Sequence, residues 1–207
     1  MSQNRIYAQW RSGPTARAML VAVAALASWG SLWGAVADIE TKEIKRDNYK
    51  VEIPSNWKEE IPAVNYKPET NITLGSRQQS YVQISIADKP ADLQKVLAAA
   101  TAQVDGAAIT TLSKAKLEEW GPHKGVGIHL KGKILDSFPG GIKIFTYNTA
   151  HYNVLVVEYY FSSELKDVLN EMDVISSSFK TADEPGFKAA EPAPAALTPP
   201  ATKPKAS

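Results

Sequence analysis

One stretch, residues 152–161, limits the fold of this chain more than any other. Successive side chains of a β-strand point to opposite faces of the sheet, so a strand that is apolar on both parities must be covered on both sides. The stretch therefore predicts a strand at the centre of a sheet, with structure packed on each face. One parity holds Tyr152, Val154, Val156 and Tyr160, and the other holds Leu155, Val157, Tyr159 and Phe161.

The two runs before it are predicted to form antiparallel neighbours of this strand. Residues 125–134 alternate in polarity, so we expect one face of that strand to be buried and the other to be exposed to solvent. Residues 138–141 include one proline and two glycines, which are typical turn residues, and they are predicted to form the turn of a hairpin. The buried face carries Val126, Ile128 and Leu130, and the exposed face carries Gly127, His129 and Lys131.

Two amphipathic helices are predicted to cover the sheet. The first follows Asp88 and Pro90, which favour a helix start, and ends at Gly106, while the second spans residues 163–179. Each has a narrow apolar stripe, which suits packing on one face of a sheet. We therefore predict an α+β fold, an α/β/α sandwich with a central antiparallel sheet and one helix on each face. The stripes are Leu93, Val96, Leu97, Ala100 and Val104, and Leu165, Val168, Leu169, Met172 and Ile175.

The remaining segments supply shorter strands and one loop. A tryptophan placed directly after a strand end is typical of a side chain that closes the core, and Trp57 is predicted to have that role. Residues 118–124 contain Trp120, Gly121 and Pro122 and are predicted to form a loop. Strands are expected at residues 39–45 (as an edge strand), 49–53, 70–74, 81–87 and 109–117.

The N-terminus has the pattern of a secretory signal peptide over residues 1–37. Arg5, Arg11 and Arg17 precede an uncharged run, residues 18–37, which ends in the small-x-small pattern of residues 35–37. We expect cleavage before Asp38 and export to the periplasm or the extracellular space. The alternative is an uncleaved anchor in the inner membrane, because the run approaches the roughly 20 apolar residues that span a bilayer.

Charge and cysteine content exclude several functions. Cleavage removes three basic residues from a chain with 23 basic and 22 acidic ones, so the mature protein has 20 and 22. This balance gives no electrostatic footprint for nucleic acid. The chain has no cysteine, which excludes disulfides, thiol catalysis and thiolate metal sites. Residues 184–207 are rich in proline and alanine and predict an extended, mobile tail, which leaves residues 38–183 as the folded domain.

Two short motifs resemble those of PsbP-like domains, the family named for an extrinsic subunit of photosystem II. One is the strand, proline, turn and tryptophan of residues 49–57, and the other is the final helix ending in serines and Phe179. The resemblance spans roughly residues 38–180. It implies an α/β/α sandwich and a non-catalytic accessory or binding role. No histidine here matches a metal-binding histidine of the photosystem subunit, so a role in water oxidation is not implied.

The candidate site residues lie at one end of the predicted meander. His123 precedes one strand and His151 lies between the next two, so both are expected at the same end of the sheet, where they are candidate ligands for zinc or a similar metal. The alternative is that both are solvated loop residues. Trp120, His123 and His151 are predicted to bind a partner, with Trp120 as the exposed member, whereas His129 is expected on the solvent-facing side of its strand.

No catalytic motif is present in the sequence. There is no glycine-flanked serine elbow, and Gly125 and Gly127 lie within a strand rather than in a phosphate-binding loop. We therefore expect no catalytic residues and no cofactor. The predicted function is that of an exported, monomeric accessory domain that binds a protein or an envelope component. The alternatives are a small metal-dependent hydrolase that uses the histidines and an accessory subunit anchored in the membrane.

Overall fold

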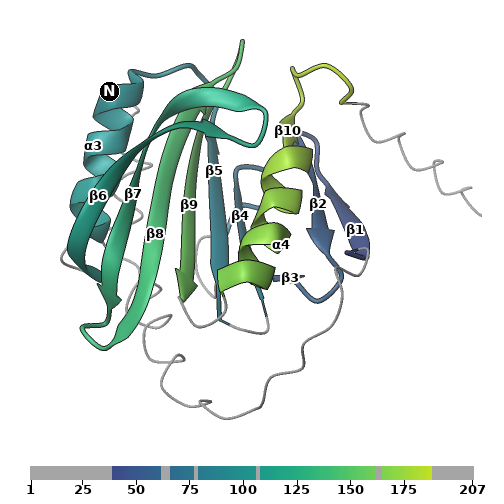
Figure 1. Ribbon diagram of the computed structural model, residues 1–207. Coiled ribbons are helices and arrows are strands. Elements are labelled where there is room, and N and C mark those ends of the chain that lie inside the picture. The colour runs from purple at the N-terminus through teal and green to yellow at the C-terminus, as the bar shows by residue number, and fades with distance from the viewer. Residues whose placement is uncertain (1–38, 62–65, 77–78, 106–107, 162–164, 188–207) are drawn as a thin grey trace, which may run out of the picture.

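The computed structural model describes residues 39–61, 66–76, 79–105, 108–161 and 165–187 (Figure 1). The predicted signal peptide, Gly106 and the greater part of the predicted tail lie outside these residues. The described chain contains two helices, α3 (Leu93–Val104) and α4 (Leu165–Ser178), and ten strands. None of its helices is long and apolar enough to cross a membrane.

A seven-stranded antiparallel sheet forms the body of the domain. Its strand order is β3-β4-β5-β9-β8-β7-β6, so β9 stands fourth of seven. This confirms the prediction that residues 152–161 form the central strand. The predicted meander is also confirmed, because β7, β8 and β9 pair in chain order. The strands are β3 (Lys58–Glu59), β4 (Asn71–Gly75), β5 (Tyr81–Ala87), β6 (Ile109–Trp120), β7 (His123–Ile134), β8 (Phe138–Asn148) and β9 (Asn153–Phe161).

A second, smaller sheet differs from the single sheet that the sequence predicts. It has the order β1-β2-β10, with β1 (Thr41–Lys45) as the expected edge strand, β2 (Tyr49–Pro54) in the middle and β10 (Lys180–Thr181) at the other edge. α4 lies next to β2 and β9, between the two sheets (Figure 1). Trp57 follows β2 and is fully buried, as predicted.

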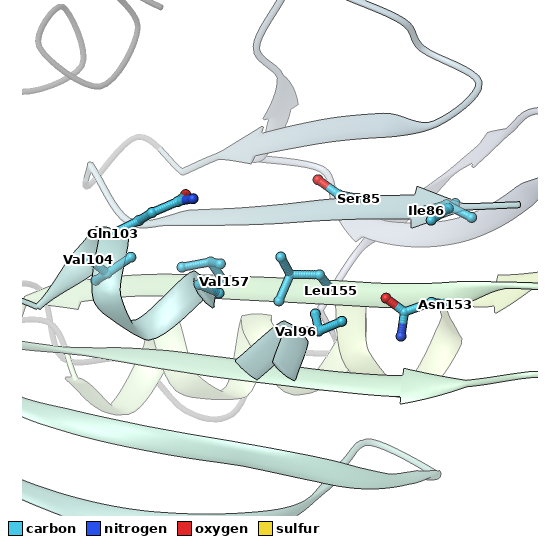
Figure 2. A pocket seen from close by; sticks show the side chains of 10 residues that line it. Ser85, Ile86, Val96, Gln103, Val104, Asn153, Leu155 and Val157 are labelled. Atoms are coloured by element: carbon cyan, nitrogen blue, oxygen red, sulfur yellow. The ribbon is translucent and has the colours of Figure 1, made fainter. Parts of the chain in front are cut away.

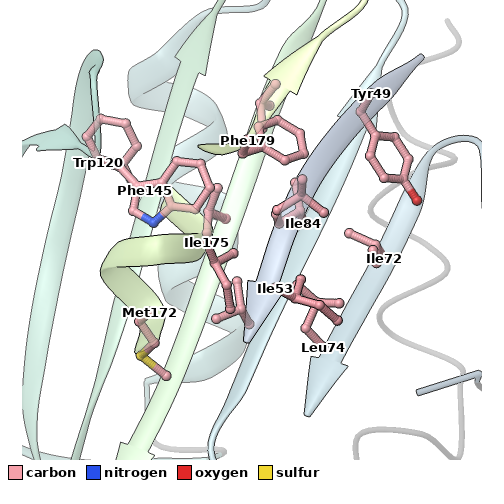
Figure 3. Close-up of a cluster of buried hydrophobic side chains, with 14 of the residues drawn as sticks. Tyr49, Ile53, Ile72, Leu74, Ile84, Trp120, Phe145, Met172, Ile175 and Phe179 are labelled. Atoms are coloured by element: carbon pink, nitrogen blue, oxygen red, sulfur yellow. The ribbon is translucent and has the colours of Figure 1, made fainter. Parts of the chain in front are cut away.

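The two parities of β9 belong to two separate cores. Leu155 and Val157 face α3, whereas Val154, Val156 and Tyr160 pack with residues of α4 and β2. One helix therefore lies on each face of the large sheet, and the predicted α+β architecture is confirmed. The α3 core also holds Val96, Ala100, Val104, Leu130, Ile142 and Ile144, and the α4 core holds Ile53, Val168, Met172, Ile175 and Phe179 (Figure 3).

The turn between β7 and β8 lies earlier than the sequence predicts. Residues 138–141 belong to β8, and the turn is made by Leu135 and Asp136, whose φ angles are 53° and 58°. Positive φ at both central positions gives the turn the twist that neighbouring strands require, even without glycine. The predicted turn is therefore wrong in position. Within β8, Gly141 leaves room for the side chain of Tyr160, whose hydroxyl lies 2.4 Å from where a β-carbon at residue 141 would stand.

The predicted loop at residues 118–124 is also wrong. β6 continues to Trp120, which pairs with His123 at the start of β7, so only Gly121 and Pro122 connect the strands. Gly121 has a φ of 55°, and a β-carbon there would lie 2.3 Å from the Ser176 carbonyl oxygen. The tip of this long hairpin therefore lies against the end of α4, as Figure 1 shows.

Candidate functional site

The end of the sheet that carries the predicted site residues is closely packed rather than open to solvent. Trp120 and His123 are 5% and 7% exposed. The His123 ring stacks on Tyr147 at a centroid distance of 4.3 Å and on Trp120 at 5.8 Å. Trp120 lies near Phe145 in the α4 core (Figure 3). The prediction of an exposed Trp120 is wrong, because strand pairing carries its ring inward.

The C-terminal segment closes over His123. We call residues 179–187 the C-terminal clasp. The Phe179 carbonyl oxygen lies 3.1 Å from His123 Nε2, and Glu184 Oε1 lies 3.2 Å from Nδ1. Both ring nitrogens therefore face oxygen atoms that can accept a hydrogen bond. Burial alone would raise the pKa of the Glu184 carboxyl, but hydrogen bonds from His123 and Thr181 hold the pKa below its usual value. Glu184, which the sequence assigns to the tail, thus contacts the domain directly.

His151 lies at the same end, as the meander predicts, but its ring does not join that of His123 in one site. It is exposed, and its backbone N–H donates to Asp183 Oδ2 at 2.7 Å. Asp183 also accepts a hydrogen bond from Thr181 Oγ1. Within the described residues, no group of three His, Cys, Asp or Glu side chains is placed to hold a metal ion. Metal binding and partner binding by these histidines therefore stay predictions.

A buried carboxylate on β9 is the feature that sequence reasoning missed. Glu158 is 1% exposed and faces the α4 side of the sheet. Its Oε1 accepts a hydrogen bond of 2.6 Å from Trp120 Nε1, and its Oε2 forms an ion pair of 2.9 Å with Lys143 Nζ. The only sign of it in the sequence is that Glu158 is the one charged residue in residues 152–161.

His129 and Tyr160 form a second polar pair on the same face. His129 Nε2 lies 2.5 Å from the Tyr160 hydroxyl, and the tyrosine ring reaches across β8 over Gly141. Burial, and then the charges of Lys131 and Lys143, lower the pKa of His129 to about 4. Burial raises the pKa of Tyr160. At neutral pH the imidazole is therefore neutral and the phenol keeps its proton.

These residues border a part of the sheet that no described helix covers. We define the open face as the α4-side surface of β7 and β8 around His129, Lys131, Lys133 and Lys143. In Figure 1 α4 lies towards β2, and no helix stands in front of β7 and β8. Lys131 and Lys133 are exposed, as predicted for Lys131, and neither has an ion-pair partner among the described residues.

Two other residues of that strand face differ from the prediction. His129 is half-buried rather than fully solvated, and Gly127 is buried. A β-carbon at Gly127 would lie 2.7 Å from the Phe145 ring, so this aromatic side chain covers the position that the sequence assigned to solvent.

A shallow groove lies on the opposite face of the sheet, between α3 and strands β5 and β9 (Figure 2). Its floor is apolar and includes Val96, Leu155 and Val157, and Ser85 and Gln103 lie among its lining residues. The groove exists because α3 packs on β7 and β8 rather than on β5.

Comparisons with known proteins found similarity only to solved structures, at low sequence identity. No family model and no curated protein matches the chain. Among solved structures, it is similar to cyanobacterial PsbP (CyanoP) of Synechocystis (12% identity, 73% of this chain and 98% of that one, TM-score 0.43). It is also similar to the Ran-binding protein Mog1p of Saccharomyces cerevisiae (10%, 70% and 97%, 0.47). A third match is LpqN of Mycobacterium tuberculosis, involved in cell envelope biogenesis (12%, 69% and 90%, 0.37). CyanoP carries the name of the family whose motifs the sequence resembles.

Proposed function

We propose that this protein is an exported, non-catalytic accessory domain that binds a protein partner through the open face. The observation that carries the proposal is the uncompensated charge of Lys131 and Lys133 on a sheet surface that no described helix covers. The two lysines are two positions apart on one strand, so their ammonium groups lie on the same face of the sheet. Exposed basic groups of this kind attract an acidic surface and orient it before contact.

The titratable side chains of the domain support a binding role rather than catalysis. His123 is engaged by Phe179 and Glu184, and Glu158 is engaged by Trp120 and Lys143. A nucleophile needs an adjacent base with access to substrate, whereas these contacts are internal and buried. They fix the hairpin tip and the sheet in one shape, which lowers the cost of binding a partner to the neighbouring surface.

Export is part of the proposal because of the N-terminal pattern. Removal of residues 1–37 would release a nearly neutral domain that we expect to be monomeric. The test is the intact mass of the protein recovered from outside the cytoplasm. A mass that corresponds to a chain starting at Asp38 supports export with cleavage, whereas a mass that includes residues 18–37 supports the anchored alternative.

The binding role is tested by affinity purification from native cells with three tagged proteins. These are the unmodified protein, a K131E/K133E variant and a K67E/K89E control. The control makes the same change in net charge at two exposed lysines, in the loop before β4 and in the loop between β5 and α3. We expect one partner to be retained by the unmodified protein and the control and lost from the open-face variant. Equal retention by all three proteins would contradict the assigned surface.

A further inference from the structure

His129 lies at the centre of the open face. Lys143 stands directly opposite it on β8, and Lys131 lies two positions further along β7. Opposite residues of antiparallel strands have β-carbons roughly 4.5–5.5 Å apart, and residues two apart on one strand face the same side. The imidazole is therefore flanked by two ammonium groups, and both contribute to its lowered pKa.

Tyr160 holds the imidazole in one orientation. Its hydroxyl reaches His129 because Gly141, between them on β8, has no side chain to block the ring. The phenol keeps its proton and can donate it to Nε2, and in that tautomer the proton of the neutral imidazole resides on Nδ1. Nδ1 has no acceptor among the described residues. This N–H and the Lys131 ammonium group have no anion within the described chain, whereas Lys143 is paired with Glu158.

The charge around this set is positive. Lys131, Lys133 and Lys143 face the same side. Two carboxylates lie near them in the described chain: Glu158 next to Lys143, and Asp136, which accepts a hydrogen bond from the Thr110 hydroxyl opposite Lys133 but forms no ion pair with a described lysine. Glu158 is 1% exposed and already paired with Lys143, so it does not neutralise Lys131 or Lys133. The β6 residues paired with His129 and Lys131 are Ala115 and Ser113, which carry no charge.

We propose that the open face binds an acidic, extended protein segment, with one carboxylate seated over His129 between Lys131 and Lys143. The inference rests on the proposed function and adds the chemistry of the partner. Lys131 and Lys133 are about 7 Å apart along the strand, which is the spacing of alternate side chains in an extended segment. A glutamate at every second position therefore matches the open face. The near-neutral charge of the mature chain favours a short acidic segment over a nucleic acid.

The probe is a fluorescein-labelled peptide of five Ser-Glu repeats, with a Ser-Gln peptide of equal length as its control. We expect the acidic peptide to bind the unmodified protein and the K67E/K89E control with equal affinity. Binding should weaken at least tenfold in K131E/K133E and as salt is raised from about 0.05 to 0.15 M, because salt screens exposed charges. The Ser-Gln peptide should not bind. Thermal melts of all three proteins serve as the folding control, since both open-face lysines are exposed.

Nuclear magnetic resonance of the imidazole gives a direct reading of where the carboxylate sits. A bound carboxylate stabilises the charged ring, so the acidic peptide should raise the pKa of His129 from about 4 towards its ordinary value. A bound peptide that leaves the His129 titration unchanged would overturn the inference. So would single-stranded DNA or phosphatidylglycerol vesicles that bind at least tenfold more tightly with the same dependence on Lys131 and Lys133.

The two proposals can fail separately. If the native partner depends on the open-face lysines but the acidic peptide does not bind, the carboxylate inference falls and the proposed function stands. If the peptide binds as expected but the native partner is retained by K131E/K133E, the open face is not the partner's surface.

Discussion

Replacing Trp120 with phenylalanine removes the only hydrogen bond that the described chain donates to Glu158 Oε1. Glu158 is 1% exposed, so water cannot replace the indole N–H. Lys143 still neutralises the other oxygen, but its contact is an ion pair rather than a hydrogen bond of normal geometry. The W120F variant therefore buries a carboxylate with an unsatisfied oxygen, for which typical costs are about 1–3 kcal/mol or more.

Trp57 provides a matched control for the loss of ring volume. It is also buried, and its Nε1 donates to Glu171 Oε2 at 2.7 Å. Glu171, however, is partly exposed and keeps a hydrogen bond from Asn56, so its carboxylate can be hydrated after W57F. Both variants lose similar apolar packing. We expect W120F to be less stable than W57F by about 1–2 kcal/mol, because only Glu158 is left without solvent.

The assay is urea denaturation of the domain at pH 7, supported by thermal melts. A domain of this size loses about 2–4 °C of melting temperature per kcal/mol, so W120F should melt about 2–8 °C below W57F. Equal stability of the two variants, or a more stable W120F, would show that Glu158 is not held as a buried charge by the indole.

Two further predictions concern the clasp and the hairpin tip. E184Q should reduce the stability of the domain at pH 7. A carboxyl whose pKa is lowered on folding stabilises the fold only while it is ionised, so the difference in stability from the unmodified protein should shrink as the pH falls below about 4.3. Urea denaturation at pH 7 and pH 3.5 checks this, and an unchanged difference would rule out the Glu184 contact with His123. G121A should lower the free energy of unfolding by about 1–3 kcal/mol, because the φ of Gly121 is positive and a β-carbon there would meet the Ser176 carbonyl. The loss should exceed that of G186A, because the atom nearest to a β-carbon at Gly186 is the end of a flexible lysine side chain. Equal losses in the two variants would contradict the contact between Gly121 and Ser176.

The fold was predictable where a single physical pattern dominates. Residues 152–161 are apolar on both parities, and this alone implies a central strand between two layers. The stripes of residues 93–104 and 165–178 then supply those layers. The second sheet was not predictable in the same way, because β10 is only two residues long and pairs with β2 across most of the chain.

The site could be predicted only in part because it depends on contacts distant in sequence. The meander places His123 and His151 at one end of the sheet. Nothing in residues 118–124 reveals that Trp120 turns inward to meet Glu158, since that contact joins β6 to β9. The role of the open face likewise depends on Gly141 leaving room for Tyr160, a contact between neighbouring strands that alternation along one strand does not show.

Site-specific photo-crosslinking in native cells tests the central claim most directly. A benzophenone side chain is introduced at position 133, on the open face, or at position 102, an exposed position of α3 on the other side of the sheet. The proposal predicts a crosslink to one protein from position 133 and none from position 102. A crosslink from position 102 alone, or the same products from both positions, would contradict partner binding at the open face.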